Sequence, residues 1–571
     1  MKKISKILSL LLALTMVLSM NLGVLTAHAD SYTIKINEST TDYKYEAYQI
    51  FDGDLSGNTQ GSYVLSNIVW GTNISKDGTP EYSTVMTAVK EITIDNSTYP
   101  FENCTSAADV ADVLKDLSKD AALLQEFADV ISKYITGSGV ASEYKTDHYE
   151  ISISDPGYYL VKNTSAPDED GVYTRFILLV VGDVEATPKS AVPSVEKKVY
   201  EESYNSVAQE ISDYGTYFND VADYDIGDSI DFKFIGTLPD NLSSYSTYKY
   251  VFHDTMDAGL TFDSDSVVVT IDGTTVPASY SGTTNYTVVY DASSAQTDGC
   301  TFEISFSDIL SLVDSTGAKI SVSSTSKVVV TYKATLNENA KIGLPGNVNE
   351  VYLQYSNNPN EGGSGDTGTT PKDKVIVFTY ELDVTKVDGT DNTKTLENAE
   401  FKLYKEVSGV KYYAKVTNGK VTGWTTDPDE AAVLTSGTDG KFSIAGLDDG
   451  TYFLLETKAP TGYNLLSDPV ELTITANTVN GQSWSGTATD ALAACDSNTD
   501  PDSASLTITV GTAKTSGNST DGTVGTTVAN NTGATLPETG GMGTKIFYTL
   551  GGILVVCAGV LLIVKRRMRN A

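Results

Sequence analysis

Short runs of alternating apolar and polar residues recur along most of the chain, and they constrain its fold more than any other feature. Examples are residues 32–36, 267–271, 327–336 and 351–355, and clusters of Gly, Asn, Asp and Ser separate such runs. Successive side chains of a strand point to opposite faces, so each run predicts a short, half-buried strand. Many short strands divided by turn residues are typical of antiparallel sandwiches. We therefore predict an all-β chain of tandem immunoglobulin-like sandwich domains.

One segment breaks this pattern. Residues 106–134 carry apolar residues at helical spacing, which predicts a short helical insertion in the first domain. A proline-bracketed stretch at residues 187–193 and a polar, glycine-rich stretch at residues 357–373 indicate boundaries between domains. The predicted domains span residues 30–188, 189–378 and 379–533.

Both ends of the chain carry signals for export. Three lysines precede an apolar stretch at residues 7–20, and small residues around Ala29 form a cleavage site, so residues 1–29 are predicted to be a signal peptide. Residues 546–564 form an uncharged apolar run that is about as long as a membrane-spanning helix. The basic tail that starts at Lys565 is typical of a cytoplasmic stop. We therefore expect an exported chain with a C-terminal transmembrane helix.

Composition argues against several classes of function. The net charge of −35 disfavours nucleic acid as a partner, because phosphate contacts need clustered Lys and Arg. Beyond the predicted signal peptide only His148 and His253 remain, which leaves little material for a His-based triad or metal cluster. We predict a protein that is not an enzyme and that uses no cofactor and no metal ion. The Asp-rich residues 220–228 are interpreted as a solvated acidic loop, and a cation-binding loop is the alternative.

The cysteines offer no disulfide within a domain. Cys104, Cys300 and Cys495 lie far apart, one in each predicted domain. An exported protein often uses disulfides. Any covalent bracing of these domains must therefore come from another source.

An internal repeat relates the first and third domains. Residues 157–167 (GYYLVKNTSAP) align without gaps to residues 450–460 (GTYFLLETKAP). Asn163 occupies the position that Glu456 holds in the second copy. An amide cannot replace a carboxylic acid as a proton donor, so any chemistry of Glu456 is not expected in the first domain.

Three polar residues of the third domain fall on the inward faces of predicted strands. Lys386, Glu456 and Asn530 each share strand parity with apolar neighbours. Buried Lys and Glu are costly unless paired or neutralised, and burial lowers the pKa of a lysine and raises that of a carboxylic acid. The hypothesis is that neutral Lys386 attacks the amide of Asn530, that Glu456 polarises this amide, and that ammonia leaves. Asn531 remains an alternative acceptor, and an unreactive buried salt bridge is the alternative interpretation.

The middle domain places the same three residue types in a different frame. Lys197 is in phase with Val195 and Val199, Asp254 follows aromatic residues at 248, 250 and 252, and Asn349 is in phase with residues 351, 353 and 355. Parity thus directs all three side chains inward and Lys198 outward. Asn347 is an alternative to Asn349, and Asp254 can also be interpreted as a turn residue before Gly259.

A pentapeptide stands shortly before the apolar run and the basic tail. Its residues are Leu536, Pro537, Glu538, Thr539 and Gly540. Pentapeptide, apolar run and tail together resemble the LPXTG sorting signal, here residues 536–571, that sortases of Gram-positive bacteria read. The resemblance implies cleavage between Thr539 and Gly540 and transfer of the Thr539 carbonyl to an amine. A simple C-terminal membrane anchor is the alternative.

Three further segments carry family resemblances. Residues 452–463 resemble the E-box of Gram-positive pilins and, with residues 382–388, a Cna B-type domain. The segments around Lys197, Asp254 and Asn349 resemble a fimbrial D2-type isopeptide-forming domain, which implies a bond from Lys197 to Asn349 with Asp254 as catalyst. Residues 184–189 (VEATPK) resemble the pilin motif, although Ala186 and Thr187 depart from it. This resemblance implies that Lys189 is the exposed amine that is joined to Thr539 of the next subunit; the alternative is an ordinary linker lysine.

Taken together, the chain resembles a sortase-assembled backbone (major) pilin with a Cna B-like first domain. This resemblance implies a structural subunit of a covalent fimbria at the cell surface, secreted and anchored to the cell wall. Its implied partners are a sortase, neighbouring pilin subunits and peptidoglycan. The alternative function is that of a wall-anchored adhesin or tip pilin, which binds a host or matrix ligand and does not use Lys189.

Overall fold

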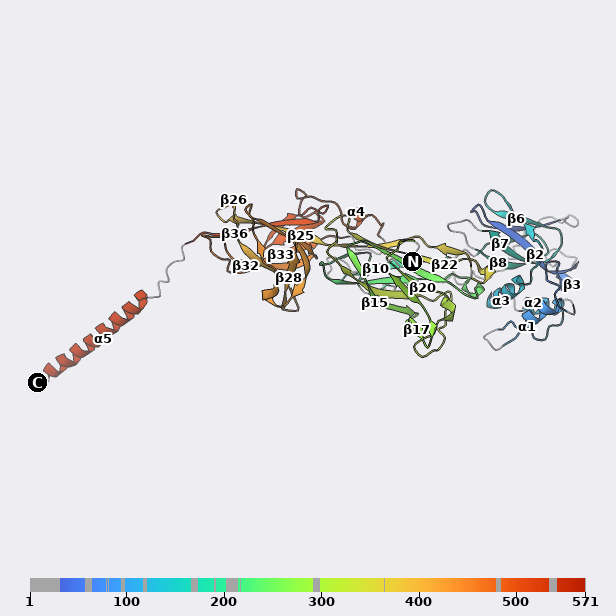
Figure 1. Ribbon diagram of the computed structural model, residues 1–571, viewed down its shortest axis with the longest axis horizontal. Helices are drawn as coiled ribbons and strands as arrows, with labels where there is room; N and C mark the ends of the chain where they lie inside the picture. The colour runs from blue at the N-terminus through green and yellow to red at the C-terminus, as the bar shows by residue number, and fades with distance from the viewer. Residues whose placement is uncertain are drawn as a thin grey trace.

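The computed structural model describes most of the chain, and strands predominate in it. The described residues are 31–56, 64–78, 80, 82–93, 98–116, 121–165, 173–188, 192–201, 214–215, 217–290, 298–363, 365–478, 484–533 and 542–569. Three β-rich domains follow one another along the long axis of the molecule (Figure 1). The predicted all-β class with tandem domains is confirmed. The predicted signal peptide, Lys189 and the pentapeptide at residues 536–540 lie outside the described residues.

The first domain contains two sheets and a group of helices. One sheet has the order β5-β6-β1-β9, and the other has the order β3-β2-β7-β8 with β4 paired to β2. Its strands are β1 (Tyr32–Ile36), β2 (Lys44–Ser56), β3 (Val64–Trp70), β4 (Val140–Ala141), β5 (Glu143–Tyr144), β6 (Tyr149–Ile153), β7 (Gly157–Ser165), β8 (Arg175–Val180) and β9 (Val184–Ala186). Alternate residues of β2 and β7 face the other sheet, where Tyr45 and Val161 pack with Ile34 and Ile36.

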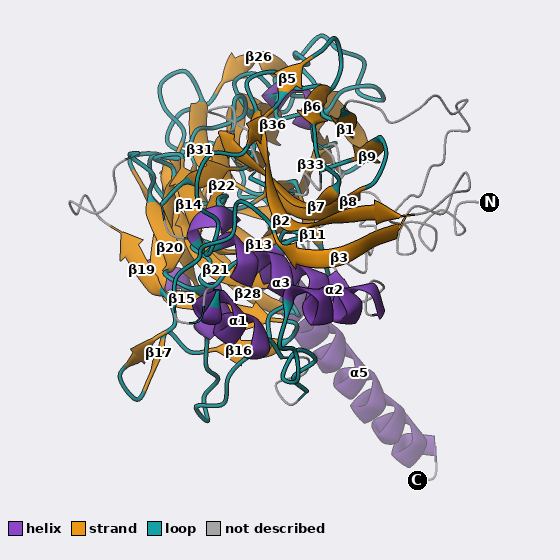
Figure 2. Ribbon diagram, turned by 90° about the vertical axis from the view of Figure 1, so that its right-hand side faces the viewer, coloured by secondary structure: helices purple, strands orange, loops and turns teal. Residues whose placement is uncertain are grey.

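The helices of the first domain cover the remaining face of the β2 sheet. They are α1 (Ser83–Lys90), α2 (Ala107–Asp116) and α3 (Ala121–Ser132), and Figure 2 shows them grouped beside β2 and β3. Phe51 and Leu160 from the sheet pack with Val89, Val110 and Phe127 from the helices. The helical insertion predicted at residues 106–134 is confirmed as α2 and α3, whereas α1 was not predicted.

The middle domain is a sandwich of two mainly antiparallel sheets. One has the order β11-β10-β13-β21-β15-β16, and the other has the order β12-β24-β22-β14-β20-β19 with β23 paired to β22. The strands are β10 (Val195–Tyr200), β11 (Phe218–Asn219), β12 (Val221–Asp223), β13 (Ser229–Gly236), β14 (Tyr250–Met256), β15 (Leu260–Ile271), β16 (Thr274–Val276), β17 (Ser279–Tyr280), β18 (Thr283–Thr284), β19 (Thr287–Tyr290), β20 (Phe302–Phe306), β21 (Val328–Leu336), β22 (Asn347–Ser356), β23 (Thr367–Thr369) and β24 (Asp373–Phe378). Short 3₁₀ turns are η1 (Leu242–Ser244), η2 (Ile309–Ser311) and η3 (Pro359–Glu361). Burial alternates strictly along β21 and nearly so along β22, as the sequence pattern predicts.

The third domain is a continuous hydrogen-bonded path of strands. Its order is β26-β25-β31-β29-β28-β27-β32-β33-β34-β35, with β30 paired to β27 and β36 paired to β25. The elements are β25 (Tyr380–Asp388), β26 (Asp391–Thr395), β27 (Glu400–Val407), β28 (Val410–Thr417), β29 (Lys420–Thr425), η4 (Pro428–Glu430), β30 (Leu434–Thr435), β31 (Lys441–Leu447), β32 (Gly450–Lys458), β33 (Val470–Ala476), α4 (Ala488–Ala491), β34 (Leu506–Val510), β35 (Ala513–Ser516) and β36 (Thr523–Asn530). The first and last strands, β25 and β36, run parallel to each other.

The internal repeat extends from sequence to strand pairing. In the first domain β1 pairs with β9 in parallel and with β6 in antiparallel orientation. In the third domain β25 pairs with β36 in parallel and with β31 in antiparallel orientation. The repeated segments form β7 and β32, two strands of equal length. The shared pairing pattern identifies β1 as the counterpart of β25.

The acidic segment at residues 220–228 is not a solvated loop, so that prediction was wrong. Asp225 is fully buried, accepts hydrogen bonds from Tyr452 Oη at 2.9 Å and from the Asp448 amide at 2.8 Å, and forms an ion pair with Lys405. Asp220 accepts a hydrogen bond from the Trp484 amide at 2.9 Å. Through Asp220 and Asp225 the segment contacts groups of the third domain that lie far away in sequence.

A buried arginine joins the first domain to the middle domain. Arg175 of β8 donates to Asp129 Oδ1 at 2.8 Å within its own domain. It also donates to the carbonyl oxygens of Pro359 at 2.9 Å and Ser244 at 2.8 Å in the middle domain.

The C-terminal helix α5 (Met542–Arg569) contains the segment Ile546–Arg566, which is long and apolar enough to cross a membrane.

Candidate cross-linking sites

The middle domain brings a lysine, an aspartate and an asparagine together between its two sheets. Lys197 comes from β10 of one sheet, and Asp254 and Asn349 come from the neighbouring strands β14 and β22 of the other. In the register of β14 and β22, Asp254 pairs with Val351 and Met256 pairs with Asn349. The two pairs are two residues apart, so the side chains of Asp254 and Asn349 point to the same, inward face. All three residues are 0% exposed. Water therefore has no access to the lysine amine.

The three side chains are in direct contact. Lys197 Nζ donates to Asp254 Oδ2 and to Asn349 Oδ1. Tyr332 of β21 completes the group, because its hydroxyl donates to Asp254 Oδ2 at 3.1 Å and accepts from Asn349 Nδ2 at 3.0 Å. The amine thus lies against both the amide carbonyl and the carboxyl group that can move a proton.

Burial shifts the acid and the amine toward their uncharged forms. It lowers the pKa of Lys197 to about 8, against the opposing attraction of Asp254. It raises the pKa of Asp254 to about 6, against the opposing attraction of Lys197. The rings of Phe232, Phe234 and Tyr332 lie 5.0–5.9 Å from Lys197 Nζ and make up much of the apolar lining.

Asn347 also points inward from β22 but has other partners. Its Oδ1 accepts from the Lys341 amide at 2.9 Å, and its Nδ2 donates to the carbonyl oxygens of Lys341 at 3.2 Å and Val377 at 3.1 Å. The amide of Asn347 therefore holds a loop and an adjacent strand. Of the two asparagines weighed as acceptors, Asn349 is the one whose side chain contacts Lys197.

The third domain places Lys386 on β25, Asn530 on β36 and Glu456 on β32. Each of these side chains is 0% exposed. Lys386 Nζ lies 3.7 Å from Glu456 Oε1 and donates to the Val528 carbonyl at 3.1 Å. Asn530 Nδ2 donates to Glu456 Oε2 at 3.0 Å and to the Asn464 carbonyl at 2.5 Å. Glu456 thus lies between the amine and the amide, and burial lowers the pKa of Lys386 to about 8.

Two buried oxygens of this group lack a hydrogen bond among the described residues. They are Glu456 Oε1 and Asn530 Oδ1. A buried unsatisfied polar group costs about 1–3 kcal/mol. In contrast, Asn531 is exposed and does not point into the core.

The first domain lacks both the acid and the amine at the corresponding places. Asn163 is fully buried on β7, and its Oδ1 accepts from the Thr174 amide at 2.5 Å. The inward residues of β1 are Ile34 and Ile36, whereas Lys35 faces outward and forms an ion pair with Glu185 at 3.1 Å. The described part of this domain therefore holds no counterpart of the Lys386–Glu456 pair.

Lys198, near the boundary between the first and middle domains, is more buried than predicted. Lys198 faces away from Lys197, as parity predicts, but it is only 2% exposed. Its Nζ forms an ion pair with Asp220 at 2.7 Å and lies over the ring of Tyr214. Neither Lys197 nor Lys198 is an accessible amine.

Tyr332 is the member of this polar group that the sequence analysis missed. It stands in the alternating run of β21 in phase with Val328 and Val330, which are fully buried. Strand parity alone predicts an inward hydroxyl at this position. A buried tyrosine hydroxyl needs a hydrogen-bond partner. This requirement is the signal by which the sequence could have linked Tyr332 to the buried polar residues.

Three segments of the chain match known families. Residues 226–359 match the family described as Gram-positive pilin backbone subunit 2, Cna-B-like domain. Residues 380–487 match the family described as prealbumin-like fold domain, and residues 529–570 match the LPXTG cell wall anchor motif.

Individual relatives come from two bacterial species. The chain is 26% identical over 420 residues to the trypsin-resistant surface T6 protein of Streptococcus pyogenes serotype M6, a match that covers 66% of this chain and 70% of the relative. The solved structure of the T6 backbone pilin of that serotype is 18% identical, with a TM-score of 0.48 over 89% of this chain and 100% of the other. The major pilin SpaD of Corynebacterium diphtheriae is also 18% identical, with a TM-score of 0.45 over the same shares.

Proposed function

We propose that this chain, a cell-wall-anchored backbone pilin of the Gram-positive type, is polymerised by a sortase and braced by internal Lys–Asn isopeptide bonds. One bond joins Lys197 to Asn349 in the middle domain, and the other joins Lys386 to Asn530 in the third. Between subunits, Lys189 is joined to Thr539 of a neighbour. The observation that carries the proposal is the shielded Lys197 amine in contact with both Asp254 and Asn349.

The bond in the middle domain needs no reagent from outside. Neutral Lys197 Nζ attacks Asn349 Cγ, and a new Nζ–Cγ bond forms as the Cγ–Nδ2 bond breaks. The reacting pair holds one proton, which lies on Asp254. Asp254 delivers this proton to Nδ2 and takes one from Nζ, so ammonia leaves and the carboxylic acid is regenerated. Asp254 Oδ1 has no hydrogen-bond partner among the described residues, which leaves it available for this transfer.

The third domain has the parts for the same reaction with Glu456 as the acid. Asn530 Nδ2 lies beside Glu456 and Asn530 Oδ1 lacks a partner. A half-turn of the Asn530 amide exchanges the two atoms and brings the carbonyl oxygen against Glu456. Glu456 then passes a proton from Lys386 to this carbonyl, which polarises it for attack by the neutral amine.

Two observations support Lys189 as the residue that links subunits. Lys197 and Lys198, its neighbours in sequence, are buried and paired. Lys189 directly follows Pro188 in the sequence. Proline removes a donor from regular sheet, so the sequence favours Lys189 as the amine that attacks an acyl-sortase carrying Thr539 of the next subunit.

Intact-mass spectrometry of the chain tests the internal bonds. We expect a mass lower than the sequence mass by two molecules of ammonia. Asp254→Ala restores one of them, Glu456→Ala restores the other, and the double variant restores both. Asp265→Ala, a change at an exposed aspartate of the middle domain, serves as the matched control and keeps both losses. An unmodified mass for the parent chain would remove the internal bonds from the proposal.

Polymerisation is tested on cells that carry the pilin sortase. Wall extracts should show a ladder of high-mass species that resists SDS, and Lys189→Ala should abolish it. Lys319→Ala, a change at an exposed lysine of the middle domain, should leave the ladder unchanged. If the parent chain gives no ladder, the chain is a wall-anchored adhesin or tip pilin instead, attached through Thr539 alone.

A further inference from the structure

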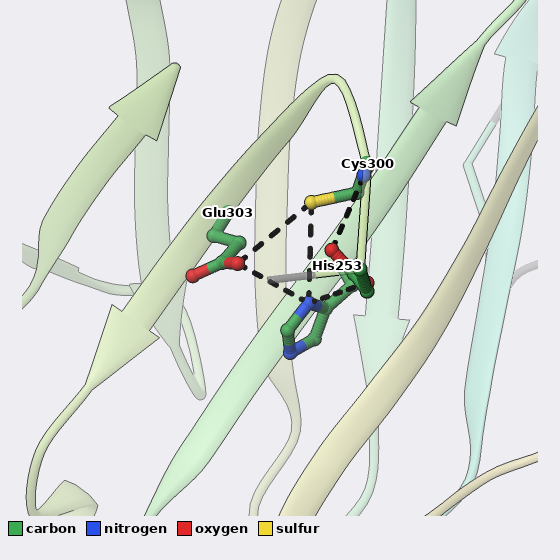
Figure 3. Close-up of side chains that lie close together, drawn as sticks. His253, Cys300 and Glu303 are labelled. Atoms are coloured by element: carbon green, nitrogen blue, oxygen red, sulfur yellow. Dashed lines mark hydrogen bonds and ion pairs between the residues drawn. The ribbon is translucent and has the colours of Figure 1, made fainter. Parts of the chain in front are cut away.

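Four side chains with metal-binding chemistry meet on the face of a middle-domain sheet that points away from the Lys197 group. His253 stands next to Asp254 on β14 and therefore faces the opposite way. Glu303 lies directly across from His253 on β20. Asp298 and Cys300 come from the segment that leads into β20. Figure 3 shows His253, Cys300 and Glu303 pointing toward one another.

The donor atoms form a compact group. His253 Nδ1 lies 3.1 Å from Asp298 Oδ2, 3.5 Å from Glu303 Oε1 and 4.0 Å from Cys300 Sγ. Cys300 Sγ lies 3.8 Å from Glu303 Oε1. All four donor atoms lie within 4.8 Å of one another. Neighbouring ligands of a tetrahedral zinc ion are about 3.3–3.7 Å apart, given bond lengths of about 2.0–2.3 Å.

Hydrogen bonds within this group of four side chains leave its acceptor atoms poorly satisfied. Two carboxylates approach the same ring nitrogen, which carries one proton at most. The thiol is only a weak donor, and its contact with Glu303 Oε1 is long, at 3.8 Å. His253, Cys300 and Glu303 are at most 9% exposed, so water solvates these three groups little, whereas Asp298 is exposed at the edge of the group.

A cation bound between these four groups satisfies all of them at once. We propose that His253, Asp298, Cys300 and Glu303 bind one divalent transition-metal ion of the Zn²⁺ class. One imidazole nitrogen, one thiolate and two carboxylate oxygens suit zinc, which accepts N, S and O ligands in tetrahedral geometry. Ca²⁺ and Mg²⁺ prefer sites made of oxygen alone, so the histidine and the cysteine disfavour them.

The surroundings hold the ligands in place. Tyr352 of β22 donates from its hydroxyl to Asp298 Oδ2 at 2.5 Å and stacks on the His253 ring with centroids 4.6 Å apart. The amide of Cys300 donates to Asp298 Oδ1 at 3.2 Å. Outer contacts of this kind orient metal ligands. The ion would clamp β14, β20 and the segment at residues 298–300 on the face of the sheet that the Lys197–Asn349 bond does not reach.

Cobalt titration of the full chain in detergent tests this site. Co²⁺ is the probe, because a thiolate ligand gives a near-ultraviolet charge-transfer band and tetrahedral geometry gives strong visible bands. We expect one Co²⁺ per chain with both signals, displacement by Zn²⁺ and no displacement by an equal amount of Ca²⁺. Thermal unfolding of the middle domain should move to higher temperature with Zn²⁺.

Variants distinguish this site from other thiols. Cys300→Ser should remove the charge-transfer band and weaken binding by at least about 100-fold, since even outer contacts are worth about 10–100-fold. Cys495→Ser, a thiol in the third domain, should change neither signal. Tyr352→Phe keeps all four ligands and should weaken binding by about 10-fold. Absence of Co²⁺ binding to the parent chain, binding without a thiolate band, or equal competition by Ca²⁺ would overturn the proposal, and each of these is measured without any variant.

Discussion

The two buried lysines differ in how close they are to reaction. Lys197 contacts both its acid and its acceptor amide. Lys386 Nζ lies 3.7 Å from Glu456 Oε1 and donates a hydrogen bond to the Val528 carbonyl. The Asn530 side chain directs its amide nitrogen, and not its oxygen, toward Glu456. Reaction in the third domain therefore requires a rotation of the amide that the middle domain does not need. We expect the middle-domain bond to form first in a newly folded chain.

The rate of the middle-domain bond should depend on pH in a bell shape. Below about pH 6 both Asp254 and Lys197 hold protons, so the amine is charged and cannot attack. Above about pH 8 the pair has lost both protons, so no proton reaches the departing nitrogen. The rate should thus be highest between pH 6 and 8. Refolding of unreacted chain from denaturant at different pH values, followed by the loss of ammonia, measures this profile; a rate that rises steadily beyond pH 9 would contradict it.

Tyr332→Phe should slow the same reaction without abolishing it. The change removes a hydroxyl that donates to Asp254 and accepts from Asn349. One such hydrogen bond is worth about 1–1.5 kcal/mol, or roughly 10-fold in rate. Tyr248→Phe is the matched control, because Tyr248 is equally buried and its hydroxyl has no partner among the described residues. Equal rates for the two variants in the refolding assay would exclude a role for the Tyr332 hydroxyl.

Strand parity explains which side chains of the sites were predictable. It directs Lys197, Lys386 and Asn530 inward, because their apolar neighbours fix the buried face. It says nothing of what covers the opposite face. Lys198 is buried by Asp220 and Tyr214, whose approach depends on the packing of residues far from β10. The metal-ligand group escaped notice for the same reason, since Cys300 and His253 meet only after β14 and β20 have paired.

At the scale of strands, the repeat shows how one scaffold is built with and without a reactive pair. β7 and β32 align, yet β7 carries Asn163 where β32 carries Glu456. The partner strand β1 presents only isoleucines to the core, whereas β25 presents Lys386. The first domain thus lacks both the buried carboxylic acid of β32 and the buried amine of β25. A buried charge without its partner costs about 3–5 kcal/mol, so neither residue is stable there alone.

Asn163→Glu should therefore destabilise the first domain and create no new bond. The new carboxyl would be buried on β7, where the neighbouring domain core has isoleucines on β1 in place of an amine, and the Thr174 amide would lose its present acceptor geometry. We expect a loss of about 3 kcal/mol or more in the free energy of unfolding of this domain. Calorimetry measures the loss, and the intact mass should show no third release of ammonia. Asn103→Glu at the surface is the control and should change neither quantity.

The elements themselves were predictable to different degrees. Long alternating runs predicted β21 and β22 well, since one face of each is continuously apolar. Helix α1 was missed because its eight residues span barely two turns, and only Val85 and Val89 of them are buried. The acidic segment at residues 220–228 was misassigned because Tyr452, Trp484 and Lys405, which satisfy its carboxylates, follow much later in the chain.

At the scale of the whole molecule, the position of the proposed linkage residue decides which domains carry tension. If neighbours join Lys189 to Thr539, force passes through the middle and third domains, and the first domain precedes the point of attachment. The proposed bonds lie in the two domains under tension. The first domain, which lacks the reactive pair, is held to the middle domain by contacts such as those of Arg175.

Arg175→Ala should release the first domain without affecting the fibre. The change removes two hydrogen bonds to backbone carbonyls of the middle domain and an ion pair with Asp129, together worth about 3–5 kcal/mol because the site is buried. Small-angle scattering should show a broader range of overall lengths, while the high-mass ladder stays the same. Lys133→Ala, an exposed cation close to the end of α3, is the control. A lost ladder would place the first domain within the stressed part of the subunit.

The parallel pairing of β25 with β36 determines how the third domain resists a pull from its two ends. Force enters at the start of β25 and leaves at the end of β36, and since the strands run side by side in one direction it slides one past the other. All residue pairs from Glu381–Thr523 to Asp388–Asn530 are then loaded in shear at the same time, rather than separated one after another. A Lys386–Asn530 bond near the far end of this ladder would act as a stop against the slide, so that stretching a fibre would strain covalent bonds before the sheet begins to peel.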